Sequence, residues 1–396
     1  MEAKYFLIDV EISYGALAPE EGENSTHYGT VTGIFCPLDW SLQKTNPSTV
    51  PMFRALVEDS KHCNPNRVKM DLRSITKKAR VYDKAMLDAV AQHREIPITK
   101  VLQVGGAVFH ESRCGSTLVS NLLVAANPQA HRVYSESSPP ISVLRICKTC
   151  SRAKQISLLR DVVYLMSRSQ TPHETRVFFK IQSIGTHAIS LWTEAFPSVP
   201  WAFVYRDPVE VLASHLKHGG DAARRAPCLR SRDHPTPILV DLVARHQEGA
   251  VDAAAATRSV SDLSTVEFCA AHLATLCWSA LEEYRKKSSH KEGRFLNYAS
   301  LPDIMWESVL PNHFDVEDLS EAHIERMKSI AQVYSKGFQD KANKPWSEDT
   351  DRKQEGASEA MRQAAKTYLD TYFEQLEEVS NHGNENDEEN SVTEKV

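Results

Sequence analysis

The octapeptide His110–Thr117, which reads HESRCGST, combines small, hydroxyl and cationic residues between an apolar segment and a segment with helical spacing. Gly115 lets the backbone approach a ligand closely, and Arg113 supplies a permanent cation. Ser116 and Thr117 add hydroxyl donors, beside helix N–H groups that have no partner within the helix. The octapeptide therefore predicts an anion-binding loop. The alternative is a simple strand-turn-helix with a capping serine and a solvated arginine.

A second set of polar residues follows the apolar segment Trp201–Tyr205. Arg206 comes directly after this segment, at the position where open α/β sheets bind ligands. Ser214 lies eight positions further on, in a helix that Pro208 begins. An arginine with a hydroxyl suits a phosphate. The alternative pairs Arg206 with Asp207 or Glu210 and leaves Ser214 on the helix surface, and Asp207 is predicted to orient Arg206 or cap the helix.

The elements that position these residues alternate between strand and helix patterns. This alternation predicts a parallel sheet with helices on both faces. The predicted strands are Val101–Phe109, Arg132–Tyr134, Arg176–Ile181, Trp201–Tyr205 and Arg294–Tyr298, and the predicted helices include Ser116–Ala126, Ile184–Phe196, Pro208–Lys217 and Ala357–Leu376.

The cation-x-Gly-[Ser/Thr]-Thr order of the loop, followed by the Arg206–Ser214 spacing, resembles the two phosphate motifs of sulfotransferases. The loop is closest in style to the tyrosylprotein and bacterial members. It differs from the triphosphatase loop, in which a lysine follows the glycine. The resemblance covers residues 98 to 375 and implies a three-layer P-loop fold of the α/β class, with a central parallel sheet, helices on both faces and an N-terminal extension.

The resemblance also implies which residues bind the co-substrate 3′-phosphoadenosine 5′-phosphosulfate, without a required metal. Arg206 and Ser214 correspond to the 3′-phosphate site, and Tyr298 to a tyrosine beside adenine. Lys336, in Tyr334-Ser-Lys-Gly337, corresponds to a late basic segment that closes on the 3′-phosphate. The 5′-phosphosulfate residues are Arg113, Cys114, Gly115, Ser116, Thr117 and Leu118.

The predicted catalytic residues are Glu136, Lys180 and Arg113. Lys180 ends a strand, where relatives have a lysine that neutralises the bridging oxygen; the alternative is a strand-end lysine that reaches solvent. Relatives with a histidine base have it two residues later, where this chain has Gln182. Glu136 is therefore the predicted base, as in tyrosylprotein sulfotransferases, and the substitutes are His110 and His131.

The predicted function is transfer of a sulfuryl group to a hydroxyl or amine acceptor, either a small molecule or a peptide. Two alternatives stay open. One is a P-loop phosphotransferase or nucleotidase, and the other is a catalytically inactive nucleotide-binding protein, which Gln182 favours. A homodimer is a candidate assembly.

The composition of the chain limits the classes of partner and the compartment that can be predicted. The 396 residues carry a net charge of −6, which argues against a general nucleic-acid binder. No apolar run is long enough for a transmembrane segment, and the N-terminus does not resemble a secretory signal. The default prediction is a soluble, cytoplasmic protein, and an upstream signal would change it to the endomembrane lumen. Of the eight cysteines, only Cys147 and Cys150 are close in sequence, and a disulfide or plain thiols are favoured over a metal or redox role.

Three regions are predicted along the chain. Residues 1–95 form an N-terminal region without recognisable chemistry. Residues 96–378 form the sulfotransferase-like domain. Residues 379–396 are polar and acidic, and their composition predicts a disordered tail.

Overall fold

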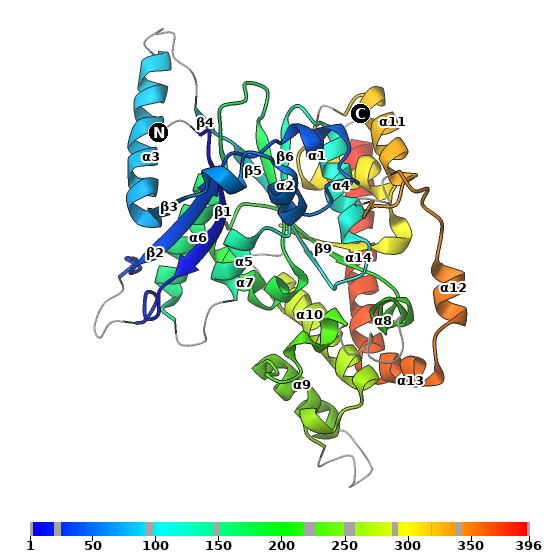
Figure 1. The fold of residues 1–396 in the computed structure, drawn as a ribbon. Helices are drawn as coiled ribbons and strands as arrows, with labels where there is room; N and C mark the ends of the chain where they lie inside the picture. Colours follow the sequence, from blue (N-terminus) through cyan, green and yellow to red (C-terminus); the bar gives the residue numbers. More distant parts are fainter. Residues whose placement is uncertain are drawn as a thin grey trace. The chain divides into compact units, whose positions relative to one another are not determined.

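Figure 1 shows the computed structural model of the chain, which describes residues 3–19, 25–91, 99–145, 150–216, 226–248, 258–286, 292–317, 319–337 and 343–393. The structure is mixed α/β, with 54% helix and 15% strand. Its largest sheet has five parallel strands in the order β10-β9-β5-β8-β6. The α/β class predicted from the strand-helix alternation is therefore confirmed.

The chain forms two compact units, each assembled from separate stretches of sequence. The first comprises Met1–Phe109, Thr117–Trp201 and Pro302–Trp346. The second comprises His110–Ser116, Ala202–Leu301 and Ser347–Val396. The region boundaries near residues 95 and 378 stay predictions.

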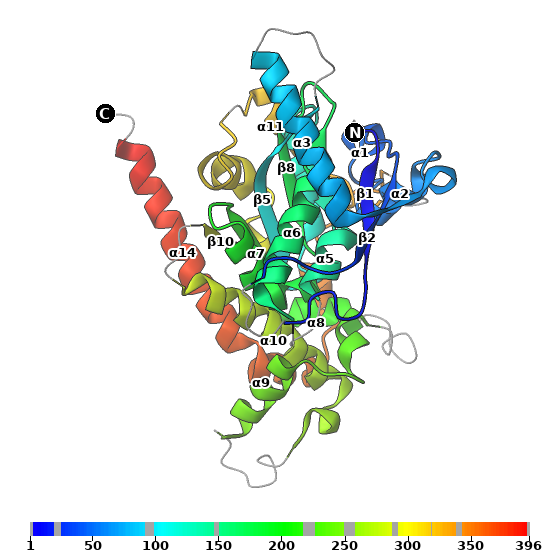
Figure 2. The same ribbon diagram turned by 90° about the vertical axis from the view of Figure 1, so that its left-hand side faces the viewer.

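The N-terminal part of the first unit is a small antiparallel sheet backed by a helix. Its strands are β1 (Phe6–Ile12), β2 (Val31–Cys36) and β3 (Val68–Asp71), paired in that order. The short helices α1 (Ser41–Thr45) and α2 (Phe53–Asp59) lie between β2 and β3 in the chain, and a disulfide joins Cys36 to Cys63. Helix α3 (Leu72–Ala91) follows β3 directly and packs against α6 (Arg152–Met166) (Figure 2).

Three strands of the large sheet belong to the first unit. They are β5 (Gln103–His110), β8 (Arg176–Lys180) and β6 (His131–Ser135). Lys180 lies opposite Val108 on one side and Ser135 on the other, so the carboxyl ends of these parallel strands meet at one edge. This unit also contains β4 (Lys100–Val101), β7 (Arg168–Ser169), α4 (Ser116–Ala126), α5 (Ser138–Leu144), α7 (Ile189–Ala195), the π-helix Met305–His313 and α11 (Glu321–Ala331).

A buried ionic cluster anchors β6 in the first unit. Arg132 forms an ion pair with Glu174, and the side chains of both residues are about 1% exposed. Lys44 also contacts Glu174, at 2.7 Å. Burial alone raises the pKa of Glu174, but Arg132 and Lys44 outweigh it and lower that pKa below its usual value. The cluster therefore depends on an ionised carboxylate.

The second unit contains β9 (Trp201–Tyr205), β10 (Gly293–Asn297) and most of the C-terminal helices. Helix α10 (Thr265–Tyr284) has a capping box made by Ser264 and Glu267, and the Cys228–Cys269 disulfide holds its first turns. The predicted helix at 357–376 is instead two helices, which meet at Leu369. The remaining helices are α8 (Pro208–Leu216), α9 (Pro237–Glu248), α12 (Thr350–Glu355), α13 (Glu359–Tyr368) and α14 (Asp370–Thr393).

The structure bears on the close pair of Cys147 and Cys150, for which the sequence predicted a disulfide or plain thiols. Cys150 is disulfide-bonded, while Cys147 lies outside the described residues. Cys114 and Cys277 are free, buried thiols. Among the described helices, none has both the length and the apolar character needed to cross a bilayer.

Candidate functional site

The predicted anion loop is a strained turn in the second unit. Ser112 and Arg113 have φ angles of 84° and 60°, in the left-handed region that non-glycine residues rarely adopt. The Ser112 N–H donates to Nδ1 of His110 at 3.1 Å. Gly115 also has a positive φ, 87°, and α4 begins at Ser116. Strand, turn and helix N-terminus thus follow one another in the predicted order, with a loop conformation that its surroundings must maintain.

A hydrogen bond joins the two predicted phosphate motifs. Nε of Arg113 donates to Oγ of Ser214 at 3.1 Å, although the two residues are 101 positions apart. Ser214 lies on α8, and the Asp207 carboxylate accepts the N–H of Glu210 at 3.0 Å in the first turn of that helix. The helix-cap role predicted for Asp207 is therefore confirmed. The Ser214 hydroxyl therefore contacts the loop, and Ser214 is not simply a helix-surface residue.

Arg206 is buried at the end of β9 and is bound by acidic groups. It forms an ion pair with Glu210 and a second with Asp349 at 2.8 Å. Its Nη2 also donates to Oγ1 of Thr350 at 3.4 Å. Burial alone lowers the pKa of Arg206, but Asp349 and Glu210 raise it above its ordinary value. The alternative interpretation of the sequence, in which Arg206 pairs with Asp207 or Glu210, predicted the ion pair with Glu210. It did not predict the second partner, Asp349.

Tyr298 packs on both motifs at once. The Arg206 guanidinium lies 4.0 Å from the centre of the Tyr298 ring, in a cation–π contact. A Cβ atom added to Gly115 would lie 2.2 Å from Cδ2 of the same ring. Because no side chain fits there, the glycine is required by the tyrosine as well as by its own φ angle. Tyr298, Gly115 and Arg206 therefore form one contiguous cluster in the second unit.

Glu111 is a buried carboxyl group next to this cluster, and the sequence interpretation gave it no role. Its Oε2 accepts the backbone N–H of Arg206 at 3.3 Å. Burial raises the pKa of Glu111 to about 8, and Asp207 adds to the rise. At neutral pH the group is therefore largely uncharged and does not repel an anion at the loop. Its place directly after a buried strand was the signal that could have identified it.

The acidic partner Asp349 of Arg206 is held at the start of helix α12 (Thr350–Glu355). Asp349 precedes this helix and also pairs with Nζ of Lys353 at 2.9 Å. Burial lowers the pKa of Lys353, with the Arg206 charge contributing. Gln354 donates to the Asp207 carboxylate at 2.9 Å.

Two of the three predicted catalytic residues, Lys180 and Glu136, meet in the first unit. Lys180, whose side chain is fully buried, forms an ion pair with Glu136. The Glu136 N–H donates to the Lys180 carbonyl at 2.7 Å, which places both residues at the carboxyl ends of β6 and β8. Gln182 donates to the Glu136 carbonyl at 3.3 Å. The alternative prediction, that Lys180 reaches solvent, is therefore wrong, because its ammonium group is buried in an ion pair with Glu136.

The remaining predicted co-substrate residues of the first unit lie on or beside α4. Thr117 and Leu118 form the first turn of this helix and are buried. One turn later, Asn121 donates to the carbonyl of Ser335 at 3.0 Å. The segment that carries Lys336 is thus attached to the helix that follows the anion loop.

The two substitute bases are less suited to proton transfer. Nδ1 of His110 accepts the Ser112 N–H and so helps to hold the loop. His131 begins β6, at the opposite end from Glu136, and its ring contacts the Leu123 carbonyl at 2.8 Å. Burial lowers the pKa of His131 to about 4. These positions favour Glu136 among the three candidates.

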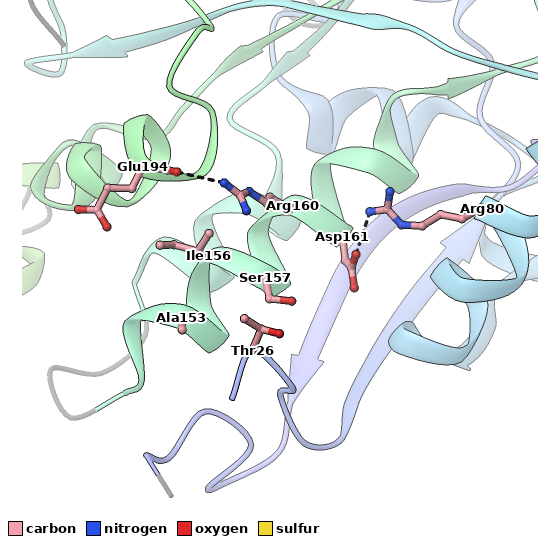
Figure 3. Close-up of a pocket in the computed structure, with 8 residues that line it drawn as sticks. All are labelled: Thr26, Arg80, Ala153, Ile156, Ser157, Arg160, Asp161 and Glu194. Carbon is pink, nitrogen blue, oxygen red and sulfur yellow. Dashed lines mark hydrogen bonds and ion pairs between the residues drawn. The ribbon is translucent and has the colours of Figure 1, made fainter. Parts of the chain in front are cut away.

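A separate surface pocket of about 450 Å³ lies in the first unit between α3, α6 and α7 (Figure 3). Arg80 pairs with Asp161 at 3.0 Å, and Arg160 donates to the Ala195 carbonyl at 2.9 Å. Both arginines are thus engaged by neighbouring groups, and we assign the pocket no ligand. Its lining residues are Thr26, Arg80, Ala153, Ile156, Ser157, Arg160, Asp161 and Glu194.

Within the part of the chain that the structure describes, no group of three or more His, Cys, Asp or Glu side chains could hold a metal ion. In comparisons with known proteins, no family model matches the chain and no curated protein matches it.

Proposed function

We propose that the chain is a sulfotransferase-like enzyme that transfers a sulfuryl group from 3′-phosphoadenosine 5′-phosphosulfate to a hydroxyl or amine acceptor. The observation that carries the proposal is the Arg113–Ser214 hydrogen bond. It links the loop motif to the Arg206–Ser214 motif at the carboxyl ends of the neighbouring strands β5 and β9.

In this proposal most of the residues that bind the nucleotide belong to the second unit. Arg113 and the loop residues that follow it bind the 5′-phosphosulfate, while Arg206 and Ser214 bind the 3′-phosphate. Tyr298 offers its ring to adenine. Asp349 occupies Arg206 in the structure, so binding of the 3′-phosphate requires that this carboxylate move away.

The chemical step needs one base and several cations. The acceptor oxygen or nitrogen forms a bond to sulfur as the bond from sulfur to the bridging oxygen of the donor breaks. Glu136 takes the acceptor proton, Lys180 and Arg113 stabilise the developing negative charge, and 3′-phosphoadenosine 5′-phosphate leaves. Positioning and electrostatic stabilisation supply most of the acceleration in this type of transfer.

Binding without turnover is the second candidate function. The observation that favours it is Gln182, which stands where histidine-based relatives have their base and instead donates to the Glu136 carbonyl. A phosphotransferase is less favoured, because the loop lacks the lysine that follows the last glycine in triphosphatases.

The test is a thermal titration with 3′-phosphoadenosine 5′-phosphate, ADP and ATP with Mg²⁺ as separate ligands. The proposal expects the first to raise the melting temperature more than the others, and Arg206→Ala to abolish the rise. Arg285→Ala, which removes an exposed arginine of the same unit, is the matched control. If wild-type protein shows no shift with the 3′-phosphorylated ligand, the proposed function is wrong; a preference for ATP would indicate the phosphotransferase.

We also propose the endomembrane lumen, rather than the cytoplasm, as the compartment. Cys36–Cys63, Cys228–Cys269 and the bond of Cys150 are disulfides, which persist in oxidising compartments and are rare in the cytosol. Mass spectrometry of protein isolated with its thiols blocked tests this, because a cytosolic protein would carry reduced Cys36 and Cys63.

A further inference from the structure

A single carboxylate, that of Asp349, lies between two cations of the second unit. Its Oδ1 is 2.8 Å from Nη2 of Arg206 and 2.9 Å from Nζ of Lys353. Its Oδ2 is 3.5 Å from Nη2 of Arg352, whose side chain is mostly exposed. Burial alone raises the pKa of Asp349, but Lys353 and Arg206 outweigh it and lower that pKa. Asp349 is therefore ionised at neutral pH and acts as an internal anion.

We call Arg206 and Lys353 the cation pair. Both side chains are largely buried, at 5% and 12% exposed, so water compensates their charges poorly. Two cations that converge on one oxygen atom are the arrangement that recognises a phosphate as readily as a carboxylate. Among the ion pairs of the described residues, Glu210 is the other carboxylate that contacts the pair. If Asp349 left, an anion from outside would have to take its place to balance the two charges.

The segment that carries Asp349 is attached to the same junction by other contacts. Helix α12 packs against α8 (Figure 1). Oγ1 of Thr350 donates to Oε2 of Glu210 at 3.3 Å, and Nε2 of Gln354 donates to Oδ1 of Asp207 at 2.9 Å. Neither bond uses the Asp349 carboxylate. The Asp349 side chain is therefore able to rotate away from the cation pair while α12 stays beside α8.

Asp349 also has alternative partners on its own helix. It occupies the N-cap position of α12, yet its side chain makes no capping hydrogen bond there. Aspartate is one of the residues that cap helices best, because its carboxylate accepts the first N–H groups of the helix. A carboxylate that leaves the cation pair can therefore regain hydrogen bonds at the start of α12.

We propose that Asp349 is an internal competitor of the ligand. Its carboxylate occupies the 3′-phosphate site in the free protein, and it turns to the N-cap of α12 when the 3′-phosphate binds to Arg206 and Lys353 together. The inference rests on the proposed function, which assigns the 3′-phosphate to Arg206, and it adds Lys353 as a second ligand. The purely structural alternative is that Asp349 only fastens α12 to Arg206.

The experiment is isothermal titration calorimetry of the full chain with 3′-phosphoadenosine 5′-phosphate and with adenosine 5′-phosphate. Asp349→Asn should raise the affinity for the first ligand by about tenfold, because a neutral amide competes less well for the cation pair. Lys353→Gln should lower the same affinity by about tenfold. Neither substitution should change the affinity for adenosine 5′-phosphate, which lacks the 3′-phosphate.

The chain offers a matched control for each variant. Asp351→Asn makes the same chemical change at an exposed position of the same helix, and Lys366→Gln changes an exposed lysine on α13. Both controls should bind the two nucleotides like wild type. Urea denaturation of every variant shows whether a change in affinity comes from a change in stability.

Equal affinity of Asp349→Asn and wild type for 3′-phosphoadenosine 5′-phosphate would overturn the inference and leave the proposed function standing. An equal gain in Asp351→Asn would also overturn it, since any nearby negative charge would then have the same effect. Unchanged affinity in Lys353→Gln would remove that residue from the site.

A thermal titration with inorganic phosphate separates the inference from the proposed function. If no form binds the nucleotide but phosphate stabilises Asp349→Asn more than wild type, the internal competitor stands and the proposed function is wrong. If neither the nucleotide nor phosphate binds to any form, both are wrong.

Discussion

Arg113 donates from Nε to Oγ of Ser214 at 3.1 Å, and this bond joins the loop after β5 to the helix after β9 within one unit. A guanidinium has five N–H donors, and the bond to Ser214 uses the one at Nε. The terminal nitrogens of Arg113 are the ones that recognise an anion in a bidentate manner. Ser214 is therefore able to position Arg113 without occupying the groups that would bind the ligand.

The first prediction concerns this bond. Ser214→Ala should weaken binding of 3′-phosphoadenosine 5′-phosphate by about tenfold or more, because a hydrogen bond to a charged group contributes about 1.5–3 kcal/mol. Isothermal titration calorimetry measures the change, and Ser74→Ala, on the exposed surface of α3, is the control. The loss in the Arg113→Gln, Ser214→Ala double variant should be smaller than the sum of the single losses, because both remove the same interaction. Additive losses would show that the two residues act separately.

Sequence patterns predicted the local elements of this site well. The strand, turn and helix around Arg113, and those around Arg206, follow from apolar runs ended by Gly, Pro and polar residues, and such signals act over a few positions. Asp207 as a helix cap is of the same kind and is confirmed by its hydrogen bond to the Glu210 N–H.

Long-range partners could not be predicted in this way. Asp349 contacts Arg206 across 143 positions, and its polar surroundings resemble any exposed segment. The protonation of Glu111 was also inaccessible, since it depends on burial by residues far along the chain. The predicted helix is divided in two at Leu369, and no glycine or proline at this position indicates that a helix ends there.

The second prediction concerns the pH dependence of stability through Glu111. Its folded-state pKa is raised from 4.5 to about 8, so between these values the folded protein holds a proton that the unfolded chain has released. Stability from this group is thus fully present below the lower pKa and is lost as pH rises through the higher one, at up to about 1.4 kcal/mol per pH unit. Glu111→Gln mimics the protonated form and should lack this loss.

Thermal melting of wild type and Glu111→Gln across this pH range measures the difference. The two proteins should melt at similar temperatures in mild acid, and the variant should become the more stable as pH approaches 8. Glu58→Gln, at an exposed position on α2, is the control. A constant difference between wild type and Glu111→Gln at all pH values would show that Glu111 does not titrate in this range.

The third prediction concerns the buried pair of Arg132 and Glu174. Glu174→Gln should destabilise the fold by about 3–5 kcal/mol, because it leaves a buried guanidinium without its counter-charge. Since the folded-state pKa of Glu174 is lowered, its contribution is present above the unfolded pKa and is lost as pH falls through the folded one. Urea denaturation at neutral and acidic pH measures both effects.

The exposed pair of Lys69 and Glu11 provides the comparison for this cluster. Glu11→Gln should cost no more than about 1 kcal/mol, because both side chains are more than half exposed and water screens them. If the Glu174 and Glu11 variants lost similar stability, burial would not be the source of the effect.

The fourth prediction concerns the catalytic base. Glu136→Gln should lower kcat by about 10²–10⁴-fold once an acceptor is found by screening metabolites and peptides with labelled donor. Because Lys180 loses its ion-pair partner in this variant, a fall in stability could imitate a fall in activity. Urea denaturation of Glu136→Gln measures the loss of stability directly and separates the two effects, while Glu194→Gln, which changes an exposed carboxylate of the same unit, is the control.

The outcomes of this last experiment distinguish three cases. Loss of turnover with unchanged binding of 3′-phosphoadenosine 5′-phosphate assigns the base role to Glu136. Full turnover in Glu136→Gln excludes that role and leaves proton transfer to another group. If wild type binds the nucleotide but transfers no label to any acceptor, Gln182 marks a protein that has kept the anion loop and lost the reaction, because an amide side chain cannot take the proton that a histidine would accept.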